Sequence, residues 1–168
     1  MKYFIIAVFF LLSIHASSQV SDNAARQDNS RERVQMLNMG VSFVPPVGFE
    51  KARDSKAFVQ KSTASSILLF EVPGISYKLY KDTLNADYFN SQNLNLFRQE
   101  KMEFSDHEGY IYECSFSVES HTFHRLFYIT GNLQKTIIFI ANYPENIKSH
   151  IIGLVNRSIK SIKIETSN

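Results

Sequence analysis

Two histidines, His121 and His124, stand three residues apart in the stretch ESHTFHRLFY, beside Glu119 and Arg125. Imidazole and carboxylate groups at this spacing are components of zinc sites and of general acid–base pairs. On a helix, residues three apart share one side, so both histidines would reach one ligand. The neighbouring aromatic residues alternate as in a β-strand, however, and a strand sends residues three apart to opposite faces. We therefore expect no metal ion bound by both histidines.

Arg125 is the more informative polar residue of this stretch. Its neighbours on the same strand face, Phe123 and Phe127, are aromatic, which places the guanidinium on a half-buried surface. We expect such an arginine to pair with a carboxylate such as Glu100 or Glu113. The alternatives are that its side chain extends to the edge of the sheet or that it captures an anion in a cleft.

Three tyrosines, Tyr77, Tyr80 and Tyr88, gather in the segment PGISYKLYKDTLNADY. Loops carry binding residues disproportionately, and tyrosine is enriched at recognition surfaces. The alternative is ordinary packing of this segment onto a sheet. Together with Arg125 and His124, the tyrosines form the set of candidate binding residues. No catalytic residue, metal ligand or cofactor is predicted.

The sequence contains none of the compact catalytic motifs: no G-x-S-x-G, S-x-x-K, H-E-x-x-H or C-x-x-C, and no glycine-rich phosphate loop. The single cysteine, Cys114, alternates with Tyr112 and Phe116. We therefore expect a buried, unreactive thiol, because a reactive one needs a partly exposed, electropositive setting. His107, in the segment SDHEG, is predicted to be a solvated turn residue.

The start of the chain predicts export. Lys2 precedes an apolar run that ends at Ile14, and small residues follow to Ser18. This pattern is typical of a secretory signal peptide, predicted over 1–18. We interpret the polar segment 19–31 as a flexible leader. No cysteine stands near the cleavage site, so a lipid anchor is not expected. An exported chain with one cysteine and no disulfide scaffold is predicted to be a bacterial protein, periplasmic or secreted.

The remaining composition excludes several classes of protein. Removal of Lys2 with the signal peptide leaves 17 Lys and Arg residues against 16 Asp and Glu residues, so the mature chain is almost neutral. This balance gives no electrostatic argument for nucleic-acid binding. No later apolar run approaches the length of a transmembrane helix. One cysteine cannot form an internal disulfide, so the core of a single domain, 32–168, must supply the stability.

Strand signals dominate that domain. Apolar runs with period-2 alternation or strand-like length recur in KAFVQKS, SSILLFEVPG, LFRQEKMEF, YIYECSFSVE, HTFHRLFYITG and QKTIIFIANYP. Helical patterns are predicted for Asp82–Leu96 and from Pro144 onward. Ile67–Phe70 and Thr136–Ala141 are apolar on both faces and require cover on both. The predicted class is α+β, an antiparallel sheet with helices on both sides.

The order of these features along the chain is distinctive. VSFVPPVGF leads to SSILLFEVPG, then to EGYIYECSF and FHRLFYITGNLQKTIIFIANYP, and a last helix closes on SIKSIKI. This order resembles the PsbP-like superfamily, named for an extrinsic subunit of photosystem II. The chain resembles more closely a set of exported bacterial proteins with the same plan. The resemblance spans about residues 33–165 and implies an antiparallel sheet sandwiched between helices. It carries over no catalytic residue, because superfamily members are mostly accessory or binding proteins.

The sequence thus predicts an exported, non-enzymatic binding or accessory domain, whose partner is an unknown protein, cell-envelope component or small ligand. One alternative is a hydrolase that uses His121 or His124 with a carboxylate. Another is a metal-binding protein that uses the same histidines.

Overall fold

The computed structural model describes residues 32–36, 38–53, 56–104 and 106–165. The predicted signal peptide and leader lie outside the described residues. No helix in the described part of the chain is long and apolar enough to cross a membrane.

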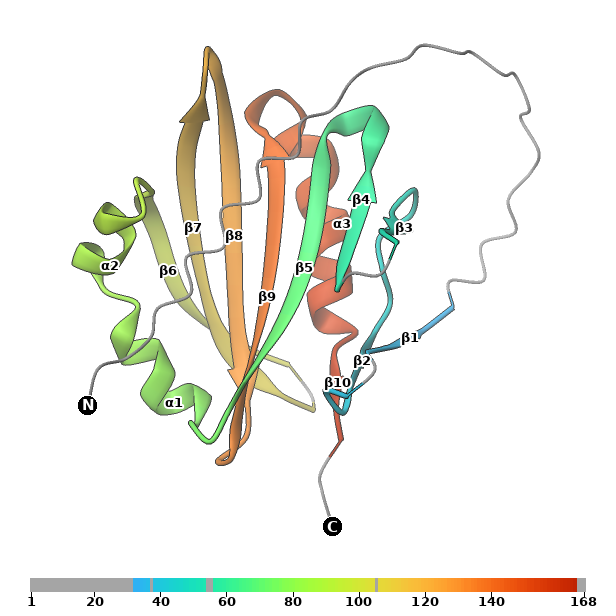
Figure 1. Cartoon of the computed structure of the whole chain (residues 1–168), viewed down its shortest axis with the longest axis vertical. Helices are drawn as coiled ribbons and strands as arrows, with labels where there is room; N and C mark the ends of the chain where they lie inside the picture. Colours follow the sequence, from blue (N-terminus) through green and yellow to red (C-terminus); the bar gives the residue numbers. More distant parts are fainter. Residues whose placement is uncertain (1–31, 37, 54–55, 105, 166–168) are drawn as a thin grey trace. The chain divides into compact units, whose positions relative to one another are not determined.

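A seven-stranded antiparallel sheet forms the centre of the domain, in the order β3-β4-β5-β9-β8-β7-β6 (Figure 1). Its strands are β3 (Glu50–Lys51), β4 (Ala57–Gln60), β5 (Ser65–Pro73), β6 (Asn95–Glu103), β7 (Glu108–Val118), β8 (His121–Gly131) and β9 (Lys135–Pro144). A second, three-stranded antiparallel sheet consists of β1 (Val34–Met36), β2 (Val41–Phe43) and β10 (Lys163–Ile164), with β2 in the middle.

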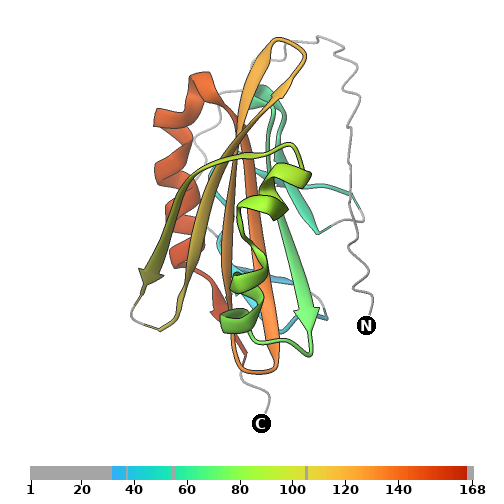
Figure 2. The same cartoon turned by 90° about the vertical axis from the view of Figure 1, so that its left-hand side faces the viewer.

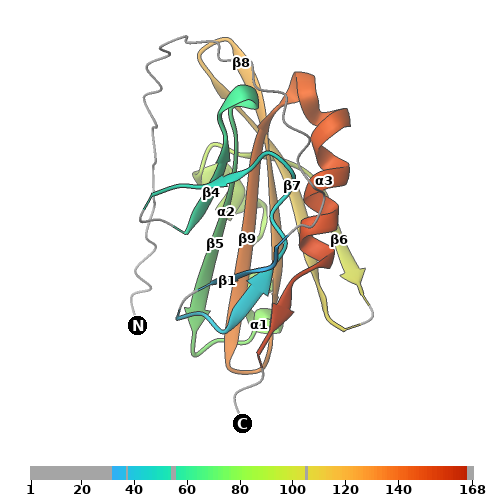
Figure 3. The same ribbon diagram turned by 90° about the vertical axis from the view of Figure 1, so that its right-hand side faces the viewer.

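Helical segments pack on both faces of the large sheet. One face carries α1 (Tyr77–Tyr80), the 3-10 turn η2 (Lys81–Thr83) and α2 (Ala86–Ser91), and we call it the α2 face (Figure 2). The other carries the 3-10 turn η3 (Glu145–Ile147), α3 (Lys148–Lys160) and the small sheet, and we call it the α3 face (Figure 3). The predicted α+β sandwich is confirmed.

The larger of the two hydrophobic cores lies on the α3 face of the sheet. Ile151, Val155 and Ile159 recur at helical spacing along α3 and are at most 3% exposed, as an amphipathic helix on a sheet requires. They pack with strand residues of the same cluster, and β2 adds Phe43, whose ring meets Phe139 edge-on at 6.1 Å. The predicted C-terminal helix therefore exists, although it begins at Lys148, after a 3-10 turn.

On the α2 face, Phe89 anchors the short helices. Its ring is fully buried and lies 5.5 Å from that of Tyr112 and 5.7 Å from that of Phe127. The predicted helix over Asp82–Leu96 is wrong in its bounds. Asn85 begins a new helix there, because its side chain accepts a hydrogen bond from the amide of Tyr88. The segment PGISYKLYKDTLNADY also contains the short helix α1, which the sequence pattern does not predict.

The two faces are covered unequally over β5 and β9. Ile67 and Leu69 are fully buried on the α3 face. On the α2 face, Leu68, Phe70 and Ile140 are only half-buried, since α2 lies beside β6 and the short α1 contacts only part of β8 and β9 (Figure 1). The expected cover on both faces is therefore complete on the α3 face and partial on the α2 face among the described elements.

Candidate functional site: an arginine on the α2 face

Strand register places four side chains in one row across the α2 face. Asn142 on β9 pairs with Ser66 on β5 and with Arg125 on β8, and Arg125 pairs in turn with Cys114 on β7. Residues paired directly across antiparallel strands point to the same side of the sheet. The row therefore sets an arginine between an amide and a thiol.

The Arg125 side chain is fixed by its neighbours. Its Nε donates a 2.7 Å hydrogen bond to Asn142 Oδ1, and Asn142 Nδ2 donates to Ser66 Oγ at 3.1 Å. The guanidinium carbon lies 4.9 Å from the centroid of the Phe116 ring, a cation–π distance. Phe116 stacks in turn on Phe123 at 5.6 Å. These contacts use one of the five guanidinium N–H groups and orient the others.

The predicted carboxylate partner of Arg125 is wrong. Glu113 pairs with Leu126 across the strands and points to the α3 face, where it is 3% exposed and accepts from Arg98. Lys148 Nζ lies 3.5 Å from its other oxygen. Glu100 also pairs with Arg98. The physical reason is strand parity, because Glu113 follows Tyr112 and precedes Cys114, both of which face the other way.

Arg125 is thus a half-buried cation without a carboxylate among the described residues. Burial lowers its pKa from the usual value, and the groups that oppose this shift are Cys114 and Tyr88, neither of which is a carboxylate. Burial also raises the pKa of the Cys114 thiol to about 12, although the Arg125 charge acts in the opposite direction. The predicted buried cysteine is confirmed, with Cys114 fully inaccessible to solvent.

The three candidate tyrosines differ in their relation to this arginine. Burial raises the pKa of Tyr88, and the Arg125 charge opposes that shift, so the two groups are within electrostatic reach. Tyr80 neighbours Tyr88, which contributes to the raised pKa of Tyr80 after burial itself. Tyr77 is buried, and its hydroxyl donates a 2.6 Å hydrogen bond to Glu108 and not to a group near Arg125.

His124 lies on the opposite face of the sheet. Its ring stacks on Tyr143 at 5.7 Å under the start of α3, and Nε2 lies 3.4 Å from Glu145 Oε1. The histidine side chain is 7% exposed. His121 is exposed at the β7–β8 hairpin and faces the other way. The two histidines therefore do not share a ligand, as the strand spacing predicts.

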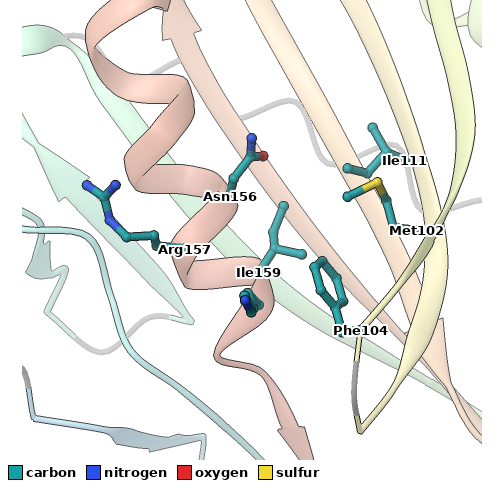
Figure 4. Close-up of a pocket in the computed structure, with 7 residues that line it drawn as sticks. Met102, Phe104, Ile111, Asn156, Arg157 and Ile159 are labelled. Atoms are coloured by element: carbon teal, nitrogen blue, oxygen red, sulfur yellow. The ribbon is translucent and has the colours of Figure 1, made fainter.

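A shallow pocket of about 190 Å³ opens between α3 and the end of β6 (Figure 4). Met102, Phe104, Ile111 and Ile159 form its apolar walls, and the other lining residues are Asn156, Arg157 and Lys160. None of the predicted site residues lines it. His107 lies nearby with its ring 4.8 Å from that of Phe104 and its side chain 8% exposed. The predicted solvated histidine is therefore wrong, because this ring packs on aromatic neighbours.

No protein-family model matches the chain, and no curated protein does. Solved structures match across most of its length. Cyanobacterial PsbP (CyanoP) from Synechocystis is 17% identical, with a TM-score of 0.56, over 87% of this chain and 99% of its own. LpqN, involved in cell envelope biogenesis of Mycobacterium tuberculosis, is 9% identical, with a TM-score of 0.56, over 80% of this chain and 90% of its own. The chain has a PsbP-like fold.

The sequence pointed to Arg125, Tyr80 and Tyr88 but missed Ser66, Asn142 and Phe116. The alternation in YIYECSFSVE already placed Phe116 with Cys114. The alignment of β5, β9 and β8 depends on long-range pairing, which local pattern does not specify.

Proposed function

We propose that this chain is an exported binding or accessory domain that captures an anionic group of a cell-envelope ligand or partner at Arg125. One observation carries the proposal. The guanidinium is half-buried and held by Asn142, and no described carboxylate neutralises it. Guanidinium forks match carboxylate and phosphate geometry, and a partly desolvated one gains more from an anion than an exposed one.

The surroundings fit a binding role. Phe116 packs against the guanidinium, and Tyr88 is within electrostatic reach of it. Partial burial of the guanidinium strengthens its attraction for an anion. Membership of the PsbP-like fold and the envelope role named for LpqN agree with an accessory domain outside the cytoplasm. Fold likeness is associational support, so the proposal depends on the arginine itself.

Anion capture is tested by titrating butanoate and methyl phosphate into the isotope-labelled mature chain and following backbone amide shifts by NMR. We expect saturable shifts in β7, β8 and β9 around Arg125, lost in Arg125→Gln. The matched control is Arg157→Gln, because Arg157 is an exposed arginine on α3 with no described ion pair. Shifts that persist in Arg125→Gln, or no shifts at all, would overturn the proposal.

Export rests on the predicted signal peptide and is tested separately. We expect to find the chain from the native bacterium in the periplasmic fraction or in the medium. Its intact mass should be that of a chain whose first residue is Gln19. A cytoplasmic chain that retains the residues up to Ser18 would contradict export and would leave the question of anion binding to the titration.

A further inference from the structure

The Arg125 site borders an apolar surface that the described elements leave half-open. Ile140 and Leu68 pair across β9 and β5, one row away from Asn142 and Ser66 on the same face. Phe70 is the next residue after Leu68 on this face of β5. All three apolar side chains are half-buried, whereas Ile67 and Leu69 on the α3 face are fully buried. We call Leu68, Phe70 and Ile140 the apolar shelf.

Tyr80 and Tyr88 belong to the short helices α1 and α2 on the same face of the sheet. Both are partly buried and pack against the same cluster as Phe70 and Ile140. Their rings add aromatic surface beside the shelf, and Tyr88 is also within electrostatic reach of Arg125. The result is one continuous surface, cationic at Arg125 and apolar along β9 and β5.

We infer that the ligand of this site is a free single-chain amphiphilic anion, whose carboxylate or phosphate binds Arg125 and whose alkyl tail lies on the apolar shelf. This inference rests on the proposed function, because it requires anion capture at Arg125. The charge selects the head group, since the described part of the site offers a cation and no carboxylate. The shelf selects the tail, because half-buried Leu, Ile and Phe gain stability when an alkyl chain removes them from water.

The test compares ligands that differ in one part. Dodecanoate, kept below its micellar concentration, is titrated calorimetrically into the mature chain beside butanoate and dodecyltrimethylammonium. We expect dodecanoate to bind at least about tenfold more tightly than butanoate, because the tail buries apolar surface. We expect dodecyltrimethylammonium, with the same tail and the opposite charge, to bind at least about tenfold more weakly than dodecanoate.

Variants assign the two halves of the surface. Arg125→Gln is expected to weaken dodecanoate about tenfold. Leu68→Thr is expected to weaken the binding of dodecanoate by a larger factor than the binding of butanoate. Thr suits a strand, so the variant keeps its β propensity. Leu133→Thr is the control, because Leu133 is 83% exposed in the β8–β9 turn, away from the shelf.

The outcomes separate this inference from the proposed function. If butanoate binds in an Arg125-dependent manner and dodecanoate binds no more tightly, the proposed anion capture is supported and the inference of an amphiphilic ligand is wrong. If the ammonium amphiphile equals dodecanoate, Arg125 does not select the head and the inference fails. Binding to phosphatidylglycerol vesicles without binding to dodecanoate would identify a membrane surface instead and would also overturn it. If neither anion binds, the proposed function itself fails.

Discussion

Arg98 and Arg125 lie on opposite faces of one sheet, and of the two only Arg98 meets carboxylates among the described residues. Arg98 bridges the buried Glu113 and the half-exposed Glu100 on the α3 face. Arg125 rests on Asn142 and Phe116 on the α2 face. One arginine therefore completes an ion-pair network of the fold, while the other holds an uncompensated charge. This contrast predicts that the loss of each arginine affects stability differently.

Loss of Arg98 should destabilise the protein, and loss of Arg125 should not. In Arg98→Leu we expect the free energy of unfolding to fall by about 2 kcal/mol, because Glu113 keeps only Lys148 at 3.5 Å. In Arg125→Leu we expect a change within about 1 kcal/mol of zero, since removing a desolvated cation offsets its lost contacts. Urea unfolding followed by circular dichroism measures both. Equal destabilisation by the two variants would mean that Arg125 is structural.

Tyr143 should tolerate the loss of its hydroxyl. The side chain is fully buried and its oxygen has no hydrogen-bond partner among the described residues. A buried hydroxyl without a partner destabilises the folded state, so Tyr143→Phe should raise the free energy of unfolding by about 1 kcal/mol. The matched control is Tyr77→Phe, which removes the bond to Glu108 and should lower stability by about 1 kcal/mol. A destabilised Tyr143→Phe would reveal a partner for that hydroxyl.

Cys114 should resist thiol reagents until the protein unfolds. Burial raises its pKa from 9.0 to about 12, which lowers the thiolate population near neutral pH roughly a thousandfold. We therefore expect negligible labelling by a chromogenic disulfide in native buffer and rapid labelling in urea. Cys114→Ser supplies the blank. Comparable rates in the two buffers would show that the thiol is accessible, and the buried placement would be wrong.

Glu108 should make stability sensitive to acid. Hydrogen bonds from Lys101, Tyr77 and Lys78 lower its pKa from 4.5 to about 2. A carboxylate with a lowered folded-state pKa contributes stability that is present above pH 4.5 and is lost as the pH falls toward 2. Glu108→Gln should therefore melt at a lower temperature than the wild type near neutral pH, and the difference should shrink on acidification. A difference that stays constant over this pH range would contradict the prediction.

Much of the sheet was predictable because its signals are local. Period-2 alternation in β7 correctly placed Tyr112 and Cys114 together, and the same period separated His121 from His124. The bounds of α1 and α2 were less predictable, since Asn85 divides two short helical segments that read as one. The alternation of side chains along β7 also excludes Glu113 as a partner of Arg125, because Glu113 faces the opposite side from Cys114. The predicted pairing of Arg125 with Glu113 did not take this alternation into account.

The sequence by itself determined the α+β class, the alternating strands, the buried thiol and the divergence of the two histidines, because each follows from residue order along one element. The tertiary structure decided the partners. Register across β5, β9, β8 and β7 brought Ser66, Asn142 and Phe116 to Arg125, and packing of α3 enclosed Glu113 and His124 on the other face. These contacts join residues far apart in the chain. Their alignment is set by the burial of whole faces, which no local pattern specifies.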